Sequence, residues 1–324
     1  MVGAYTGNPE ALQRLLADHR EVARQLLDPD LVKGTGTPGF DGLLAMVLDR
    51  ALDPGTGAAA TRERAWINLI DGVGYDGTEK VAGHYATFEN SPLNQVLAKN
   101  LTPYLGELAR GQVHADSPGL GLAPSGPWTG LHEDVAARFI GALMQDPATA
   151  TMLHADFQAY VKGLDIGQAH PFSSDPAERA QYTRLSAEAG GLSNLLLGGS
   201  AYAEFNDDAF IDVVADAALL PVNFTIARIF KDATPLGSTG VDYYTSGGKD
   251  VLSDMLKDHL DELTGETADV VGARIVDAQM RILTDSLDAH GQPSLTVEDT
   301  EQLRQAFRGR LYPALVKALD ERGG

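Results

Sequence analysis

Aspartates at helical spacing are the residues of this sequence that could most directly do chemistry. Asp207, Asp208 and Asp212 would lie near the start of one helix, where carboxylate oxygens suit a hard divalent cation. No Asn/Asp, Ser/Thr and Glu set follows at helical spacing to complete such a site. Acidic side chains also stabilise a helix N-terminus. We therefore interpret these aspartates first as partners of the helix dipole. They are also the candidate metal ligands of the sequence, as the weaker alternative. We expect no bound cofactor.

A second group of carboxylates is more typical of a surface than of a metal site. Asp254, Asp258 and Asp261 recur at spacings of three and four, which places them on one face of a helix. Tyr243 and Tyr244 stand in the loop before that helix. Tyrosines are enriched at protein interfaces, and carboxylates can complement the charge of a basic partner. These five residues are therefore the candidate partner-binding residues.

The motifs of nucleotide, phosphate and hydrolytic sites are incomplete. Residues 34–39 match G-x-G-x-x-G, but the residues before them end a helix instead of a strand. In residues 246–250, Asp250 replaces the hydroxyl that a phosphate loop uses to bind magnesium. The eight histidines show no zinc-ligand spacing, and no serine stands in a G-x-S-x-G elbow. The sequence predicts no catalytic residue, with a site assembled from distant residues as an alternative.

The composition excludes further classes of protein. The 324 residues include 45 Asp and Glu, 25 Lys and Arg and no cysteine, which gives a net charge of −20 with neutral histidines. An acidic surface repels phosphates, which argues against nucleic acid as a partner. Without cysteine there is no disulfide, thiol nucleophile or thiolate-bound metal. Twelve acidic and four basic residues fall within 204–262, so we expect a basic partner to dock there.

The most apolar stretch, residues 209–230, is too interrupted to form a stable transmembrane span. Its longest charge-free run, residues 217–227, is shorter than the roughly 20 residues that cross a bilayer. We predict a buried hairpin or kinked helix, with a membrane-active, pore-forming toxin segment as the alternative. No secretory signal pattern opens the sequence, which fits the cytoplasm or export without a classical signal peptide.

Recurring helix starts predict an all-α fold. A capping side chain followed by proline suits the first turn of a helix, and the six such positions are Asn8, Asp28, Asp53, Ser91, Asp146 and Asp175. Thr61 and Thr296 are further caps, while Pro103, Pro221 and Pro313 should kink or split helices. Strand signals are nearly missing. We predict an orthogonal or bundle array of about 12 helices with no substantial β-sheet, over residues 9–27, 40–52, 61–72, 78–88, 92–110, 131–145, 147–163, 176–197, 207–231, 248–263, 267–289 and 297–320.

Two loops rich in glycine and proline could divide the chain. Residues 111–130 form the first and residues 234–248 the second. We predict that the first separates an N-terminal helical part, residues 1–112, from a central and C-terminal helical part, residues 113–324. One continuous domain is the alternative, and the second loop is a lesser boundary or a long ordered loop.

Several stretches of the sequence resemble an uncharacterised actinobacterial α-helical family. They are residues 40–44 (FDGLL), 64–70 (RAWINLI), 94–108 with LTPYL, 135–160 with FI and MQDP, and the small-residue-rich stretch 184–203. That family is associated with type VII (ESX-like) secretion, with WXG-motif proteins and with polymorphic-toxin loci. The resemblance covers roughly residues 30–230. It implies a helical module that accompanies or carries an exported toxin, and it implies no catalytic residues.

Two short patterns bear on export. Type VII substrates carry Trp-x-Gly followed by Tyr-x-x-x-Asp/Glu, and this chain has Trp128-Thr129-Gly130 as well as Tyr85 four residues before Glu89. The two patterns stand in the reverse order. Tyr85 and Glu89 are therefore a possible export signal, with a pair on a helix surface as the alternative.

The leading functional hypothesis is a non-enzymatic helical module for protein–protein interaction. Its partner would be a WXG-type or toxin component, or another protein with a basic surface. The alternatives are the membrane-active toxin module and the enzyme whose site is assembled from distant residues.

Overall fold

The computed structural model describes most of the chain as helix. It describes residues 5–27, 40–74, 91–112, 124–131, 133–164, 173–203, 207–231, 248–254, 256–257, 267–289, 291–308 and 315. Of these residues, 86% are helical and none lies in a β-strand. The predicted all-α class is confirmed.

The described part contains twelve α-helices and two 3₁₀ turns. They are α1 (Pro9–Asp18), α2 (Arg20–Leu26), α4 (Phe40–Leu52), α5 (Ala59–Gly74), α7 (Pro92–Leu101), η2 (Thr102–Tyr104), α8 (Leu105–Gly111), η3 (Gly126–Gly130), α9 (Glu133–Met144), α10 (Pro147–Gly163), α11 (Pro176–Tyr202), α12 (Asp207–Lys231), α14 (Ala268–Ala289) and α15 (Val297–Phe307). Residues 248–254 and 256–257 are also helical.

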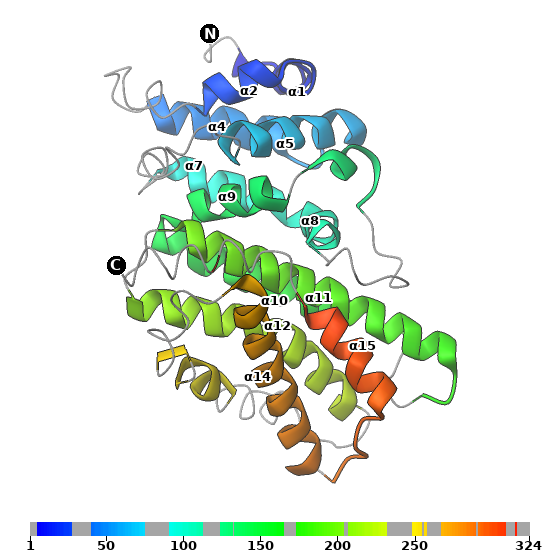
Figure 1. The fold of residues 1–324 in the computed structure, drawn as a ribbon. Coiled ribbons are helices and arrows are strands. Elements are labelled where there is room, and N and C mark those ends of the chain that lie inside the picture. Colours follow the sequence, from blue (N-terminus) through cyan, green and yellow to red (C-terminus); the bar gives the residue numbers. More distant parts are fainter. Residues whose placement is uncertain are drawn as a thin grey trace.

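The helices form stacked layers (Figure 1). The α1–α2 pair covers α4 and α5 at one end, α7, α8 and α9 follow, and α11 and α12 lie next as a long antiparallel pair. Helices α14 and α15 cross that pair at the opposite end. One hydrophobic cluster includes residues from both predicted parts of the chain, so a division near residue 112 falls across a shared core.

Helix α11 lies at the centre of the lower half of the molecule in Figure 1, and much of it is buried on every side. Its residues from Ser186 to Ser200 are all buried, and Glu188 is the one charged residue among them. Its glycines allow close approach: a Cβ at Gly191 would lie 2.8 Å from the carbonyl carbon of Ala109 on α8. Neighbouring helices can therefore pack directly on its backbone.

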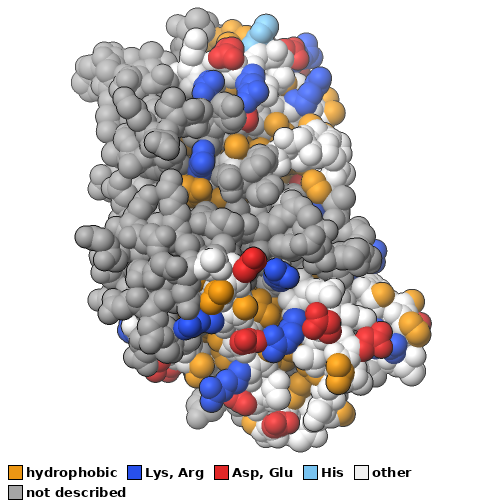
Figure 2. All heavy atoms as spheres, in the orientation of Figure 1, with side chains coloured by type: hydrophobic (Ala, Val, Ile, Leu, Met, Phe, Trp, Pro, Cys, Tyr) orange, Lys and Arg blue, Asp and Glu red, His pale blue; other side chains and the backbone are white. Residues whose placement is uncertain are grey.

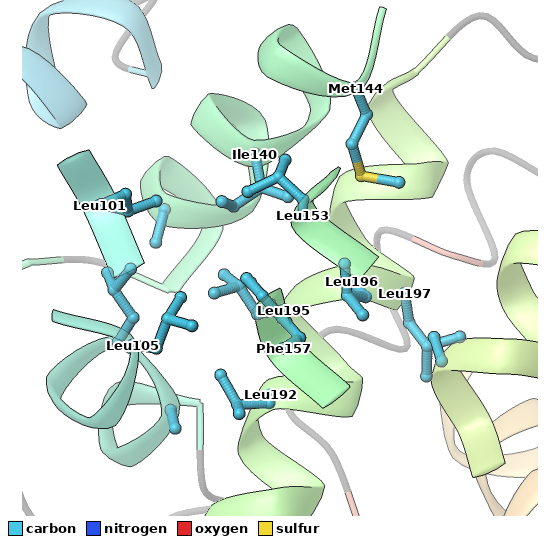
Figure 3. Packing of buried hydrophobic residues seen from close by; sticks show 14 of the residues in the cluster. Leu101, Leu105, Ile140, Met144, Leu153, Phe157, Leu192, Leu195, Leu196 and Leu197 are labelled. Carbon is cyan, nitrogen blue, oxygen red and sulfur yellow. The ribbon is translucent and has the colours of Figure 1, made fainter. Parts of the chain in front are cut away.

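Leucines complete the packing around α11. Leu192, Leu195 and Leu196 of α11 face Leu101 of α7, Leu105 of α8, Ile140 of α9 and Leu153 and Phe157 of α10 (Figure 3). All of these side chains are almost fully buried. The core around α11 thus joins four other helices.

Charged residues lie on the outside of the lower helices. Figure 2 shows basic and acidic side chains interspersed over the region of α14 and α15. Arg304 of α15 pairs with Asp277 of α14, and Arg308 lies 3.4 Å from Asp269. These pairs are exposed, so each contributes at most about 1 kcal/mol.

The apolar stretch at residues 209–230 lies within α12. Phe210, Val214, Leu219 and Ile226 are buried, and Asp212 is exposed. The helix continues through Pro221, so this proline does not split the helix predicted over residues 207–231. Among the described helices, none is both long enough and apolar enough to cross a bilayer.

Candidate functional site

Ionisable side chains gather where α10 and α12 meet the helical residues 248–254. The Nζ atom of Lys249 donates to Asp216 Oδ2 at 2.9 Å and lies 3.7 Å from Asp212 Oδ1. His154 of α10 is close enough to interact electrostatically with both Asp216 and Lys249. The cluster therefore brings together three segments that are far apart in the sequence.

The surroundings shift two pKa values in this cluster. Burial lowers the pKa of His154, and the positive charge of Lys249 lowers it further, although Asp216 opposes the change. Burial would also lower the pKa of Lys249, but its hydrogen bond to Asp216 and the charges of Asp216 and Asp212 outweigh burial and raise it. Lys249 is therefore cationic and His154 is neutral at neutral pH.

This charge arrangement suits an ion pair more than a bound cation. Lys249 supplies the positive charge that a metal ion would otherwise bring to Asp212 and Asp216. Among the described residues, no group of three or more His, Asp or Glu is placed to hold a metal. The Nε2 atom of His154 is buried and makes no hydrogen bond to the described residues. A neutral imidazole nitrogen can in general accept a proton, and this one is enclosed by the protein.

The outer face of residues 248–254 carries acidic groups around an apolar side chain. Leu252 and Leu256 point into the core, where they are 0% and 2% exposed. Asp250 and Asp254 are exposed, and Val251 between them is 45% exposed. Lys249 is directed at α12, and the basic side chain nearest to these two carboxylates along the segment is the exposed Lys257, three residues after Asp254. We call Asp250, Val251 and Asp254 the acidic face.

The structure brings only part of the predicted site residues together. Asp212 joins the cluster with Lys249, and Asp254 belongs to the acidic face. The side chains of Asp207 and Asp208 and the whole of Tyr85, Glu89, Tyr243, Tyr244, Asp258 and Asp261 lie outside the described residues. The interpretations of those residues stay predictions.

Three members of the cluster were not predicted from the sequence as site residues. The spacing of four between Asp212 and Asp216 signals one helix face, and it could have added Asp216 to the candidates. Lys249 follows two glycines, in the stretch that matches a phosphate loop only incompletely. His154 has no local signal, because its partners lie more than sixty residues further along the chain.

A second polar network crosses the centre of the molecule. Tyr160 of α10 donates to the buried Glu188 Oε1 at 2.5 Å, and Arg110 of α8 lies 3.6 Å from the same oxygen. Arg110 also bonds Glu107 at 2.8 Å. Burial, together with the hydrogen bond to Glu188, raises the pKa of Tyr160. The network neutralises a buried carboxylate and ties α8, α10 and α11 together.

Comparisons with known proteins leave these residues to be interpreted on their geometry. No protein-family model, no curated protein and no solved structure matches the chain.

Proposed function

We propose that this protein is a helical protein-interaction module whose acidic face binds a cationic segment of a partner. The observation that supports the proposal most is Val251, which stands exposed between Asp250 and Asp254 while the adjacent Lys249 is paired with α12. An apolar contact flanked by two carboxylates suits a segment in which an apolar side chain is flanked by lysine or arginine.

The charge around this face favours the same kind of partner. The stretch 204–262 carries −8 of the net charge of −20. Long-range attraction would therefore accelerate encounter with a basic segment, and salt would weaken it. The contact with Val251 would add a contribution that does not depend on salt.

A peptide titration with matched variants tests the proposal. The probe is a fluorescent peptide of alternating lysine and leucine, and Kd is measured by anisotropy at low salt. Asp250→Asn/Asp254→Asn is compared with Asp18→Asn/Glu21→Gln, whose acidic residues are exposed on α1 and α2 at the other end of the molecule. Both variants change the net charge by the same amount. We expect the first to weaken binding about tenfold and the second much less; equal losses would refute the proposal.

We further propose that the partner belongs to a type VII secretion or polymorphic-toxin system. The support is the resemblance of residues 30–230 to the actinobacterial helical family. The test expresses the tagged chain in an actinobacterium with and without a working type VII system. Export that requires the system and is lost in Tyr85→Ala/Glu89→Ala supports the proposal, whereas equal secretion from both strains contradicts it.

The enzyme alternative has one observation in its favour, the neutral and unpaired Nε2 of His154 beside Asp216. A screen against ester, amide and phosphate substrates tests this alternative. Turnover that His154→Gln abolishes, with the fold intact by circular dichroism, would support an enzyme over an interaction module.

A further inference from the structure

Residues 124–131 form a short turn that lies against α5 and α8. We call these residues the strap. Its central side chain, Trp128, is only 2% exposed and lies 5.2 Å from the ring of Tyr104. Ser125, Gly126, Thr129 and Gly130 are exposed. The strap is therefore attached to the helices chiefly through one buried aromatic ring.

One carboxylate supplies the hydrogen bonds that attach the strap. The backbone N–H of Ser125 donates to Glu107 Oε2 at 2.6 Å, and its hydroxyl donates to Glu107 Oε1 at 2.9 Å. The other hydrogen bonds among described strap residues are internal, such as Trp128 N–H to the Ser125 carbonyl and Leu131 N–H to the Trp128 carbonyl. The strap can thus leave the helices without losing its own turn.

An unpaired donor opposes the closed position. The indole Nε1 of Trp128 is buried and makes no hydrogen bond to the described residues. Water would bond this N–H once the ring left its place. The free energy gained in this way offsets part of the free energy lost with the apolar contacts of the ring. The apolar contacts of Trp128 and the hydrogen bonds to Glu107 therefore favour the closed strap, and the unpaired N–H opposes it.

The surface beneath the strap does not depend on it. Tyr104 receives a hydrogen bond at 2.7 Å from the buried Arg62, and its ring lies 6.2 Å from that of Trp66. Arg62 and Trp66 are fixed on α5, and Trp66 also packs edge-on against Phe139 of α9. None of these contacts among Tyr104, Arg62, Trp66 and Phe139 involves Trp128.

We propose that residues 124–131 open as a unit over Tyr104 while the helices stay folded, and that Glu107 is the latch. Opening uncovers the Tyr104 ring beside the Arg62 guanidinium. The strap is in this respect a built-in cover for an aromatic surface, and its opening is local unfolding with a lower free energy than global unfolding.

Hydrogen exchange followed by mass spectrometry tests the proposal on the full chain. In the wild type, the amide of Ser125, which is the strap N–H bonded to Glu107, should exchange at least about 100-fold faster than the amides of α5, at a rate that low urea does not change. Glu107→Ala should speed exchange of this amide about tenfold, because its bond to a charged acceptor is lost, and Ser125→Ala, which removes the hydroxyl bond alone, about threefold. Glu21→Ala, at an exposed position of α2, is the control and should change nothing.

Ser125→Ala keeps the test independent of any damage to Arg110, which loses a partner in Glu107→Ala. Equal protection of the strap and α5 in the wild type would overturn the proposal. Strap exchange that is unchanged in both Glu107→Ala and Ser125→Ala would overturn the role of Glu107 as the latch.

Discussion

Replacing Gly191 with alanine tests the close packing of α11 against α8. The added Cβ would lie 2.8 Å from the carbonyl carbon of Ala109 and 3.2 Å from its Cα, and closer still to the carbonyl oxygen. Carbon atoms at rest stay about 3.5–4.0 Å apart. Since backbone atoms cannot rotate away, α8 must retreat by on the order of 1 Å.

The expected cost follows from two opposing effects. Overpacking of this kind costs about 1–3 kcal/mol. The better helix propensity of alanine returns up to about 1 kcal/mol. We therefore expect Gly191→Ala to lower the free energy of unfolding by about 1–2 kcal/mol.

The control is Gly42→Ala in α4, where an added Cβ meets nothing within 4 Å. It gains the propensity without the clash, so it should stabilise the chain by about 0.5–1 kcal/mol. Urea unfolding followed by circular dichroism measures both variants under one set of conditions. If Gly191→Ala proved as stable as Gly42→Ala, the account of α11 as a helix packed backbone to backbone would be refuted.

Three further predictions concern single side chains. Burial lowers the pKa of His154 in the folded state. The contribution of His154 to stability is therefore full above its ordinary pKa of 6.5 and is lost as the pH falls through that value towards the folded pKa. His154→Gln should flatten this acid loss of stability in urea midpoints measured from about pH 7 to about pH 5. The pKa of Tyr160 is raised, so above pH 10.0 the folded state keeps a proton that the unfolded state loses, and the stability falls as the pH rises. Tyr160→Phe should remove this alkaline loss of stability in thermal melts. An unchanged loss would contradict the raised pKa of Tyr160. Asp146 caps α10 through Thr149 N–H at 3.1 Å, so Asp146→Ala should cost about 0.5–2 kcal/mol in calorimetry, and no change in the melting temperature would count against the cap.

Helix starts were the most predictable part of the fold, because a cap and its proline are local. Asn8, Ser91, Asp146, Asp175 and Thr296 each accept a backbone N–H bond in the first turn of a helix, as predicted. The predicted bounds of α4 and α10 agree with the structure.

Two of the candidate cap positions, Asp53 and Thr61, do not begin a helix. Asp53 accepts the N–H of Gly55 at 2.7 Å in a turn instead of opening a helix. Thr61 lies inside α5, which already begins at Ala59. Asp and Thr favour turns as well as caps, so their presence alone does not separate the two structures.

Helix ends depended more on tertiary contacts. The predicted helix over 9–27 is divided at His19, which has a non-helical backbone, and α15 ends at Phe307, short of the predicted residue 320. Helix α11 extends to Tyr202 because its last turns, including Gly199, pack against Ile140 and Met144 of α9. Pro103 does interrupt its helix, where η2 separates α7 from α8.

The candidate site could be predicted only in part, because contacts between distant segments build it. Asp212 and Asp254 were found from their spacing, since spacing reports the face of one helix. The pairing of Lys249 with Asp216, and the burial of His154 near them, follow from how α10, α12 and residues 248–254 meet. No periodicity within one segment carries that information.

Carboxylate footprinting is the most direct test of the acidic face as a binding surface. The chain is labelled with a carbodiimide and an amine, with and without the lysine–leucine peptide, and the modified residues are identified by mass spectrometry. The account predicts that the peptide suppresses labelling of Asp250 and Asp254 and leaves labelling of Asp18 and Glu21 unchanged. Equal suppression at both ends of the molecule would contradict it, because binding would then follow the overall charge and not this face.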